Sequence, residues 1–257
     1  MADILEQRLF AGTGKTVSTL GLGTVKFGRN TGVKYPGGDG FTLPSDAEVN
    51  VILDLCLDYG LTLLDTAPAY GSAEERLGAL LGARRDKFFL MSKTGEVFDG
   101  AQSSYNFSAP HTRDSVEQSL RRLKTDRLDC VLVHSNRDDV DVIENTPVLE
   151  TLARLKEEGK ILSFGVSTYT VAGGKRAAEL SDAVMVAFHQ AYRDEAEVIS
   201  HAHRLGRAVL VKKGLASGHA GDPAENIRFI LGTAGVTSLV FGSLTPANIR
   251  ANIRAAL

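Results

Sequence analysis

Short apolar runs alternate with longer amphipathic stretches from residue 19 to the end of the chain. The apolar runs are rich in Val, Leu and Phe, and polar loops and helical patterns follow them. They predict strands over residues 20–25, 61–66, 88–93, 128–134, 162–168, 183–189, 208–213 and 238–243. The amphipathic stretches predict helices over residues 46–58, 73–81, 113–123, 148–158, 171–180, 195–205, 224–231 and 246–255.

Capping signals mark several helix ends. Ser45 is suited to cap the first helix, and Thr245 followed by Pro246 is typical of the start of the last one. Glycine readily takes the left-handed conformation that ends a helix, and it stands at four expected ends: Gly60, Gly159, Gly206 and Gly235.

Strict alternation of strand and helix predicts a parallel sheet with right-handed crossovers. Eight such units in 257 residues favour an α/β fold of one kind, the closed (β/α)8 TIM barrel, as a single domain over residues 1–257. A doubly wound sheet would more often have about six strands and a break in composition between its halves. The segment before residue 19, with its turn at Gly12-Thr13-Gly14, predicts an N-terminal β-hairpin at the barrel bottom.

The composition of the chain mainly excludes some classes of protein. Hydrophobic residues make up 43% and charged residues 23% of the chain, which is typical of a soluble globular protein. The longest apolar run, residues 183–188, is far shorter than the roughly 20 residues that span a bilayer, so we expect no membrane segment. The acidic start of the chain has no apolar segment of the kind found in secretory signals.

The net charge and the cysteine content restrict the expected binding partners and location of the protein. A net charge of −2 argues against nucleic acid as the main partner. Cys56 and Cys130 cannot build a disulfide framework, which favours a cytoplasmic location. No metal site is expected, because His201 and His203 lie two residues apart on a helix and point away from each other. We expect a small-molecule substrate and a monomer or weak oligomer.

Polar residues stand where three consecutive predicted strands stop. Asp65, Lys93 and His134 each end a strand, in phase with the alternate apolar residues before them. If those phases face inward, an acid, a lysine and a histidine converge at the barrel mouth, where the active sites of such barrels lie. Tyr70 reaches back from the next loop. Each of these residues alone is also compatible with an ordinary structural role.

Together the four residues make a plausible acid–base group. A phenol has a pKa near 10, too high for ready proton exchange at neutral pH. The Lys93 ammonium would lower that pKa for Tyr70, and Asp65 would keep the lysine charged. Such a group suits proton transfer to a carbonyl or alcohol oxygen. His134 would donate a hydrogen bond to the same oxygen.

Five stretches carry a resemblance to the aldo-keto reductase superfamily over essentially the whole chain. They are Leu20-Gly-Leu-Gly-Thr24, Leu64-Asp-Thr-Ala-Pro-Ala-Tyr-Gly-Ser-Ala-Glu-Glu-Arg-Leu-Gly78, Ser92-Lys93, Leu132-Val-His134 and Gly165-Val-Ser-Thr168. The resemblance implies a (β/α)8 barrel that binds a nicotinamide cofactor in extended form. It also implies a catalytic tetrad of Asp65, Tyr70, Lys93 and His134, in which Tyr70 donates the proton.

The resemblance further implies a set of cofactor-binding positions, some of which depart from the family pattern. They are Gly23, Thr24, Ser167, Thr168, Gln190, Lys213, Leu215, Ser217, Gly242, Ser243, Asn248 and Asn252. Thr168 stands where the family usually has asparagine. The glutamine usual on strand six aligns with either His189 or Gln190, and we favour Gln190. Lys212-Lys213-Gly214-Leu215 replaces the common Tyr-Ser-Pro-Leu.

The resemblance favours NADP(H) over NAD(H), by about ten-fold. Lys213 and Arg250 add positive charge near the expected cofactor track, but Asn248 stands at the usual arginine position. A neutral amide cannot match a charge-assisted pair with a 2′-phosphate, so the preference should be modest.

We therefore expect an NAD(P)H-dependent reductase of aldehydes or ketones. One alternative is a cofactor-binding regulatory protein of the same fold with little turnover, and another is a Schiff-base aldolase that uses Lys93. Two loops, residues 28–44 and 95–110, would wall the substrate pocket. Their aromatic residues, Tyr35, Phe98, Tyr105 and Phe107, would either form an apolar rim suited to small aromatic or aliphatic carbonyls or simply pack the loops onto the barrel.

Overall fold

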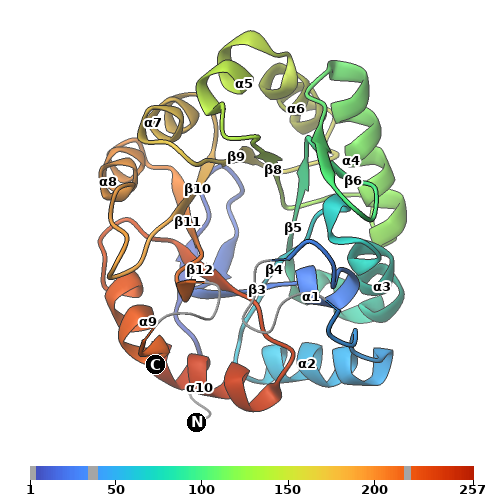
Figure 1. The fold of residues 1–257 in the computed structure, drawn as a ribbon, viewed down its shortest axis with the longest axis vertical. Coiled ribbons are helices and arrows are strands. Elements are labelled where there is room, and N and C mark those ends of the chain that lie inside the picture. Colours follow the sequence, from blue (N-terminus) through green and yellow to red (C-terminus); the bar gives the residue numbers. More distant parts are fainter. Residues whose placement is uncertain (1–3, 34–39, 217–220) are drawn as a thin grey trace.

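Eight parallel strands form a closed barrel (Figure 1). The structure, a computed structural model, describes residues 4–33, 40–216 and 221–257. The barrel strands, in chain order, are β3 (Leu20–Gly23), β4 (Leu63–Asp65), β5 (Phe89–Thr94), β8 (Cys130–His134), β9 (Phe164–Ser167), β10 (Ala183–Ala187), β11 (Ala208–Lys212) and β12 (Ser238–Phe241). Each pairs with its neighbour in that order, and β12 pairs with β3 to close the ring. The predicted (β/α)8 barrel is confirmed.

Helices surround the ring of strands (Figure 1). They are α1 (Val25–Gly28), α2 (Asp46–Asp58), α3 (Ala73–Leu80), α4 (Ala109–Leu123), α5 (Asp139–Asn145), α6 (Val148–Glu157), α7 (Val171–Leu180), α8 (Ala196–Arg204), α9 (Pro223–Leu231) and α10 (Pro246–Ala256). Two 3-10 helices, η1 (Pro68–Tyr70) and η2 (Gly82–Lys87), lie on either side of α3. The sequence did not predict α5, whose short acidic stretch has no apolar repeat. Within the described ranges, no helix has the length and apolar character needed to cross a membrane.

Several predicted caps are present. The Ser45 hydroxyl accepts from the backbone N–H of Glu48, and the Glu48 carboxylate accepts from the backbone N–H of Ser45, so α2 begins with a capping box. Gly60 and Gly206 follow α2 and α8 with φ of 68° and 66°, the left-handed conformation expected of them. Helix α4 begins before its predicted start, because Ser108 caps it and proline fits its first turn.

The N-terminal hairpin fills the bottom of the barrel, as predicted. Its strands β1 (Gln7–Leu9) and β2 (Thr16–Ser18) pair antiparallel, and in Figure 1 the hairpin is seen through the ring of strands. Phe10 and Val17 join the apolar cluster inside the barrel, and the Phe10 ring lies 4.6 Å from that of Phe89. The Lys15 ammonium also contacts the buried carboxylate of Asp129 at 2.6 Å.

The barrel interior and the helix-facing layer are separate apolar clusters. The interior cluster contains alternate residues of the strands: Leu63, Phe89, Met91, Cys130, Leu132, Ala183, Met185, Ala208 and Leu210. The residues between them pack outward against the helices. This alternation decides which strand-end residues face the mouth.

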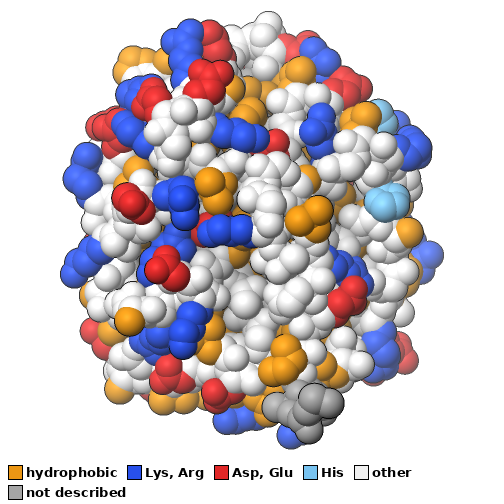
Figure 2. Space-filling view, turned by 180° about the vertical axis from the view of Figure 1, so that it is seen from behind, with side chains coloured by type: hydrophobic (Ala, Val, Ile, Leu, Met, Phe, Trp, Pro, Cys, Tyr) orange, Lys and Arg blue, Asp and Glu red, His pale blue; other side chains and the backbone are white. Residues whose placement is uncertain are grey.

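The two faces of the molecule differ in construction. Loops that follow the strands lie at the mouth, where the residue 95–110 segment folds into an antiparallel ribbon of β6 (Glu96–Phe98) and β7 (Ser103–Tyr105) that the sequence did not predict. Figure 2 shows the molecule from behind the view of Figure 1. On that face, acidic and basic side chains are interspersed among small groups of hydrophobic ones.

Candidate active site

Three polar side chains meet at the carboxyl ends of adjacent strands. Asp65, Lys93 and His134 end or nearly end β4, β5 and β8, and each is in phase with the interior residues of its strand. The Lys93 ammonium donates to Asp65 Oδ1 and, at 3.0 Å, to the carbonyl of Thr66. Asp65 and Lys93 are both buried. A buried lysine and a buried acid are tolerated here because each neutralises the other.

The backbone holds Asp65 and Tyr70 in place. Thr24 donates to the Asp65 carbonyl from its backbone N–H at 2.9 Å and from its hydroxyl at 3.0 Å. Tyr70 ends η1, which packs tightly on the end of α1. A Cβ on Gly28 would lie 2.1 Å from the backbone nitrogen of Ala73, and one on Gly71, where φ is +60°, would lie 2.2 Å from the Gly28 carbonyl oxygen. Only glycine permits this close approach.

Tyr70 lies close to both Lys93 and His134. The Lys93 ammonium is 4.7 Å from the centre of the Tyr70 ring, and the His134 ring meets the Tyr70 ring edge-on with centroids 6.3 Å apart. Burial lowers the pKa of Lys93, but the attraction of Asp65 and the interaction with Tyr70 outweigh it and hold that pKa above its usual value. A permanently charged ammonium beside the phenol stabilises a phenolate.

Glu96, which the sequence analysis did not identify, contacts His134. Its Oε2 lies 2.6 Å from His134 Nδ1, and its Oε1 accepts from the Ser103 hydroxyl and lies 3.6 Å from the Arg29 guanidinium. Burial raises the pKa of Glu96, but His134, Ser103 and Arg29 together lower it to about 2. For His134, burial lowers the pKa, Lys93 and Lys212 act in the same direction, and Glu96 opposes them.

Lys212 is a second lysine at the mouth that the sequence analysis did not select. It ends β11 in phase with the interior residues Ala208 and Leu210, and that phase is the signal that could have identified it. Its ammonium donates to the Ser167 hydroxyl at 2.8 Å and to the Thr168 carbonyl at 2.7 Å. The ammonium of the predicted residue, Lys213, lies 5.5 Å from the centre of the Tyr169 ring, compared with 4.1 Å for Lys212.

Glu195 faces Lys212 from the loop after β10. Burial lowers the pKa of the Lys212 ammonium and raises that of the Glu195 carboxyl, while their mutual attraction opposes both changes. One Glu195 oxygen accepts from the Ala187 backbone N–H at 3.2 Å. The other is buried without a hydrogen-bond partner among the described residues.

The residues predicted to hold the nicotinamide end of a cofactor lie beside this pair. Ser167 and Thr168 are buried at the end of β9, and in the ladder Ser167 pairs with His134 of β8. Within the described residues, the Thr168 hydroxyl is buried and unpartnered. An unsatisfied hydroxyl next to a hydroxyl that accepts from Lys212 fits a ligand with an amide group, such as nicotinamide.

The structure after β10, the sixth barrel strand, does not favour either His189 or Gln190 as the cofactor-binding residue. The strand ends at Ala187, and His189 and Tyr192 pair across a tight turn with their rings 5.9 Å apart. Gln190 is exposed, and its backbone N–H donates to the Asn226 side chain at 3.1 Å.

The remaining predicted cofactor positions are spread along the rim. Gly23 ends β3, and Gly242 and Ser243 follow β12. On α10, Asn248 is exposed and Asn252 is largely buried. Leu215 packs against the outer apolar cluster. Ser217 lies outside the described residues.

Aromatic residues of the mouth loops are paired with cations or with each other. The Arg29 guanidinium stacks 3.5 Å from the centre of the Phe98 ring. Tyr105 stacks on Phe107 with centroids 6.1 Å apart, and Phe107 also packs against the outer apolar cluster. Tyr35 lies outside the described residues. These contacts fit the packing role for Phe98 and Phe107 and leave the half-exposed Tyr105 available to a substrate.

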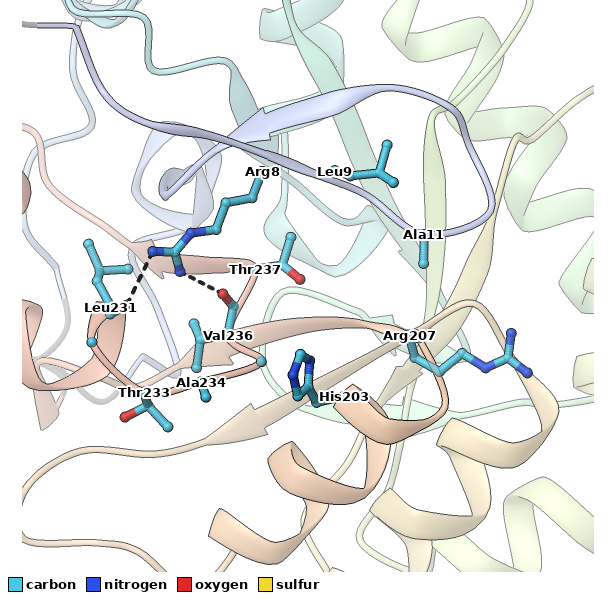
Figure 3. A pocket seen from close by; sticks show the side chains of 13 residues that line it. Arg8, Leu9, Ala11, His203, Arg207, Leu231, Thr233, Ala234, Val236 and Thr237 are labelled. Carbon is cyan, nitrogen blue, oxygen red and sulfur yellow. Dashed lines mark hydrogen bonds between the residues drawn. The ribbon is translucent and has the colours of Figure 1, made fainter.

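A groove of about 520 Å³ lies at the opposite end of the barrel (Figure 3). It is formed by the hairpin, the end of α8 and the turn before β12. The Arg8 guanidinium at its wall donates to the Leu231 and Val236 carbonyls, which are drawn in Figure 3. The groove therefore belongs to the packing of the hairpin and is remote from the strand ends that carry Asp65, Lys93 and His134.

Comparisons with known proteins agree with the fold and with the family resemblance. The model of the Aldo/keto reductase family matches residues 19–222. An aldo-keto reductase from Bacillus subtilis (YhdN) is 34% identical over 172 residues, which cover 65% of this chain and 48% of that protein. D-arabinose 1-dehydrogenase from Saccharomyces cerevisiae is 34% identical over 136 residues, which cover 50% and 38%. The chain spans about half the length of the curated relatives it matches.

Solved structures match over the full barrel. A provisionally named aldo-keto reductase from Pseudomonas aeruginosa superposes with a TM-score of 0.91 and 43% identity, over 100% of this chain and 97% of that one. The holo form of an aldo-keto reductase from Bacillus halodurans superposes with a TM-score of 0.81 at 22% identity, over 98% and 90%, and supports the fold alone.

Proposed function

The chain belongs to the aldo/keto reductase family, and from this membership we propose that it is an NAD(P)H-dependent reductase of aldehydes or ketones. The observation that carries the proposal is the buried Asp65–Lys93 ion pair, with the Lys93 ammonium 4.7 Å from the centre of the Tyr70 ring. A buried ion pair costs free energy of desolvation, and a structural role alone would be served as well by apolar residues. A proton donor that must carry negative charge after each reaction does require such a pair.

Tyr70 donates its proton to the carbonyl oxygen of the substrate. The Lys93 ammonium stabilises the phenolate that remains, and Asp65 together with the Thr66 carbonyl keeps that ammonium charged and oriented. A nicotinamide cofactor, when bound, supplies the hydride to the carbonyl carbon. His134, whose ring meets the Tyr70 ring edge-on, orients the carbonyl oxygen and exchanges protons with the phenol.

Ser167 and Thr168 would hold the carboxamide of the cofactor, because the buried Thr168 hydroxyl has no other partner among the described residues. Gly242, Ser243, Asn248 and Asn252 would line the adenosine end. Neither Asn248 nor Arg250, both exposed on α10, is held by a charged partner in the described structure, so a 2′-phosphate is free to recruit the arginine. We therefore propose NADP(H) as the preferred cofactor.

Replacing Tyr70 with phenylalanine tests the proposed function. Tyr70→Phe should lower the single-turnover rate of NADPH oxidation by an unactivated aldehyde by at least ~10²-fold, since a positioned general acid contributes that much. The dissociation constant of NADPH should stay nearly unchanged, and the same titration with NADH measures the cofactor preference.

Tyr59→Phe is the matched control, because it removes a phenol that packs against the outer apolar cluster, away from the Asp65–Lys93 pair. It should keep most of the wild-type rate. If Tyr70→Phe retains more than about a tenth of the wild-type rate, Tyr70 is not the proton donor. If the wild type binds NADPH but reduces no aldehyde or ketone in a broad panel, the regulatory alternative replaces the reductase.

A further inference from the structure

A carboxylate outside the predicted tetrad is buried against its histidine. The Glu96 side chain is only 10% exposed, and its Oε2 lies 2.6 Å from His134 Nδ1. Burying an ionised carboxylate is costly unless its neighbours compensate. Ser103 and Arg29 contribute to that compensation, and His134 makes the shortest ion-pair contact with Glu96.

The contact determines which nitrogen of His134 carries a proton. Because the pKa of Glu96 is lowered to about 2, the carboxylate is ionised at neutral pH and can only accept hydrogen bonds. The contact is too far out of line to count as a hydrogen bond, but at 2.6 Å an unprotonated Nδ1 and the carboxylate oxygen would repel each other, so the contact favours a proton on Nδ1. Burial, Lys93 and Lys212 lower the pKa of His134 and favour the neutral ring. A neutral ring protonated at Nδ1 has a bare Nε2.

We propose that Glu96 is a positioning residue that fixes His134 in the Nδ1–H tautomer and makes Nε2 a proton acceptor. The proposal rests on the proposed function for its consequence in catalysis. Neutral His134 accepts a hydrogen bond at Nε2 from the Tyr70 hydroxyl or an alcohol, and it donates one to a carbonyl only after it has taken up a proton. In reduction, His134 takes up a proton from water at Nε2, returns that proton to the Tyr70 phenolate and becomes neutral again, while Glu96 stays ionised throughout.

Arg29 connects the same carboxylate to the segment that carries Tyr70. Its guanidinium lies 3.6 Å from Glu96 Oε1 and donates at 3.1 Å to the carbonyl of Ala69, the residue before Tyr70. The same guanidinium stacks on Phe98 in the ribbon. Glu96 and Arg29 together therefore align both proton-handling side chains, His134 directly and Tyr70 through the backbone.

The charges around the pair are few and come from several elements. Lys93 of β5 and Lys212 of β11 act on His134, and Tyr70 of η1 meets its ring edge-on. Arg29, Tyr105 and Tyr169 are the other titratable groups that interact with Glu96. Glu96 is the carboxylate that acts most strongly on the His134 ring. Its removal should therefore change the proton position on that ring.

Nitrogen NMR of the protein labelled at its six histidines tests the proposal without cofactor or substrate. The His134 signals are assigned by their loss in His134→Gln. In the wild type near neutral pH, we expect a protonated Nδ1 and an unprotonated Nε2. Glu96→Leu should move the proton to Nε2. Glu96→Gln keeps an accepting oxygen but loses the charge, so it should keep the tautomer and move the His134 titration to lower pH.

Ser103→Ala is the control, because it removes a hydrogen bond to Glu96 and keeps the carboxylate; the Nδ1–H tautomer should persist. Unchanged signals from the other histidines show that each variant is folded. If Glu96→Leu does not fold, Glu96→Gln still tests the proposal. A wild-type His134 protonated at Nε2, or a titration that Glu96→Gln does not move, overturns the proposal. Either result leaves the reductase proposal standing, and a failed reductase assay leaves the tautomer measurement valid.

Discussion

Two lysines at the mouth, the buried Lys93 and the partly buried Lys212, differ in what neutralises them. Lys93 has a carboxylate in direct contact, Asp65, and it stays charged in spite of burial. Lys212 donates to the uncharged oxygens of Ser167 and Thr168, and burial lowers its pKa. The first arrangement suits a permanent charge beside a phenolate. The second suits contact with a ligand that brings its own polar or anionic groups.

The lowered pKa of Glu96 makes the stability of the protein depend on pH. Its folded pKa of about 2 lies below the ordinary value of 4.5, so Glu96 stabilises the fold above about pH 4.5 and loses that effect as the pH falls toward 2. We therefore compare the free energies of unfolding of the wild type and Glu96→Gln at each pH. The difference in favour of the wild type should be about 3 kcal/mol larger near neutral pH than at pH 2.

Urea unfolding at a series of pH values measures this difference. Glu157→Gln, a substitution of an exposed glutamate on α6, is the control and should show little pH-dependent difference from the wild type. A gap between wild type and Glu96→Gln that is constant from pH 2 to pH 7 would mean that Glu96 gains no stabilisation from its partners.

Residue phase in the strands was enough to identify Asp65, Lys93 and His134 from the sequence, because side chains alternate strictly between the two faces of a strand. The same reasoning applied to β11 indicates Lys212, whereas the family resemblance indicated Lys213. Glu96 could not be found in this way. It begins the short strand β6, and the ribbon that carries it to His134 forms through tertiary contacts that leave no periodic pattern in the sequence.

At the scale of elements, α3 and α4 pack closely enough for their backbones to touch. Glu74 of α3 is buried, and its carboxylate accepts from the Ser92 hydroxyl of β5 at 2.6 Å and from Arg122 of α4 at 2.7 Å. One turn further along α3, a Cβ on Gly78 would lie 2.0 Å from the Arg122 carbonyl oxygen. The glycine therefore allows the helices to approach and the Glu74 contacts to form.

Gly78→Ala should lower the free energy of unfolding by about 2–3 kcal/mol, since the helices must separate to admit the methyl group. Thermal and urea unfolding measure the loss. Gly221→Ala is the control, because a Cβ there meets no atom of the described residues within 4 Å, and its effect should stay within about 0.5 kcal/mol. If the two variants unfold alike, the close contact between α3 and α4 is not what requires glycine.

Element boundaries were predictable where local chemistry decides them. The Ser45 cap and the left-handed glycines that follow α2 and α8 depend on a few adjacent residues. Helix α5 and the β6–β7 ribbon depend instead on packing against the rest of the barrel, and the sequence patterns there are too weak to predict them.

At the scale of the whole molecule, the hairpin and the proposed catalytic site lie at opposite ends of the barrel. The hairpin seals the bottom of the barrel, while the polar strand ends gather at the mouth. Phe10, with no exposed surface, stacks on Phe89 inside the barrel. Phe10→Ala should therefore lower the free energy of unfolding by about 3–5 kcal/mol, the usual cost of removing a buried phenylalanine.

Below its unfolding temperature, Phe10→Ala should keep the kcat/KM of the wild type, because the tetrad lies at the opposite end of the interior. Leu9→Ala is the control, since Leu9 is 67% exposed and its removal leaves no cavity. Urea unfolding and steady-state kinetics on the same preparations separate the two effects. A large loss of kcat/KM in folded Phe10→Ala would show that the two ends of the barrel are coupled.

The pairing of β3 with β12 also bears on how the protein is made. Gly21 of β3 pairs with Val240 of β12. The first barrel strand therefore cannot pair along this edge until most of the chain has left the ribosome. The hairpin also cannot complete its contacts before then, because Arg8 donates to the carbonyls of Leu231 and Val236. During synthesis the amino-terminal strands therefore carry an open sheet edge that can pair with other nascent chains. Chaperones that cover this edge until translation ends would raise the yield of folded protein.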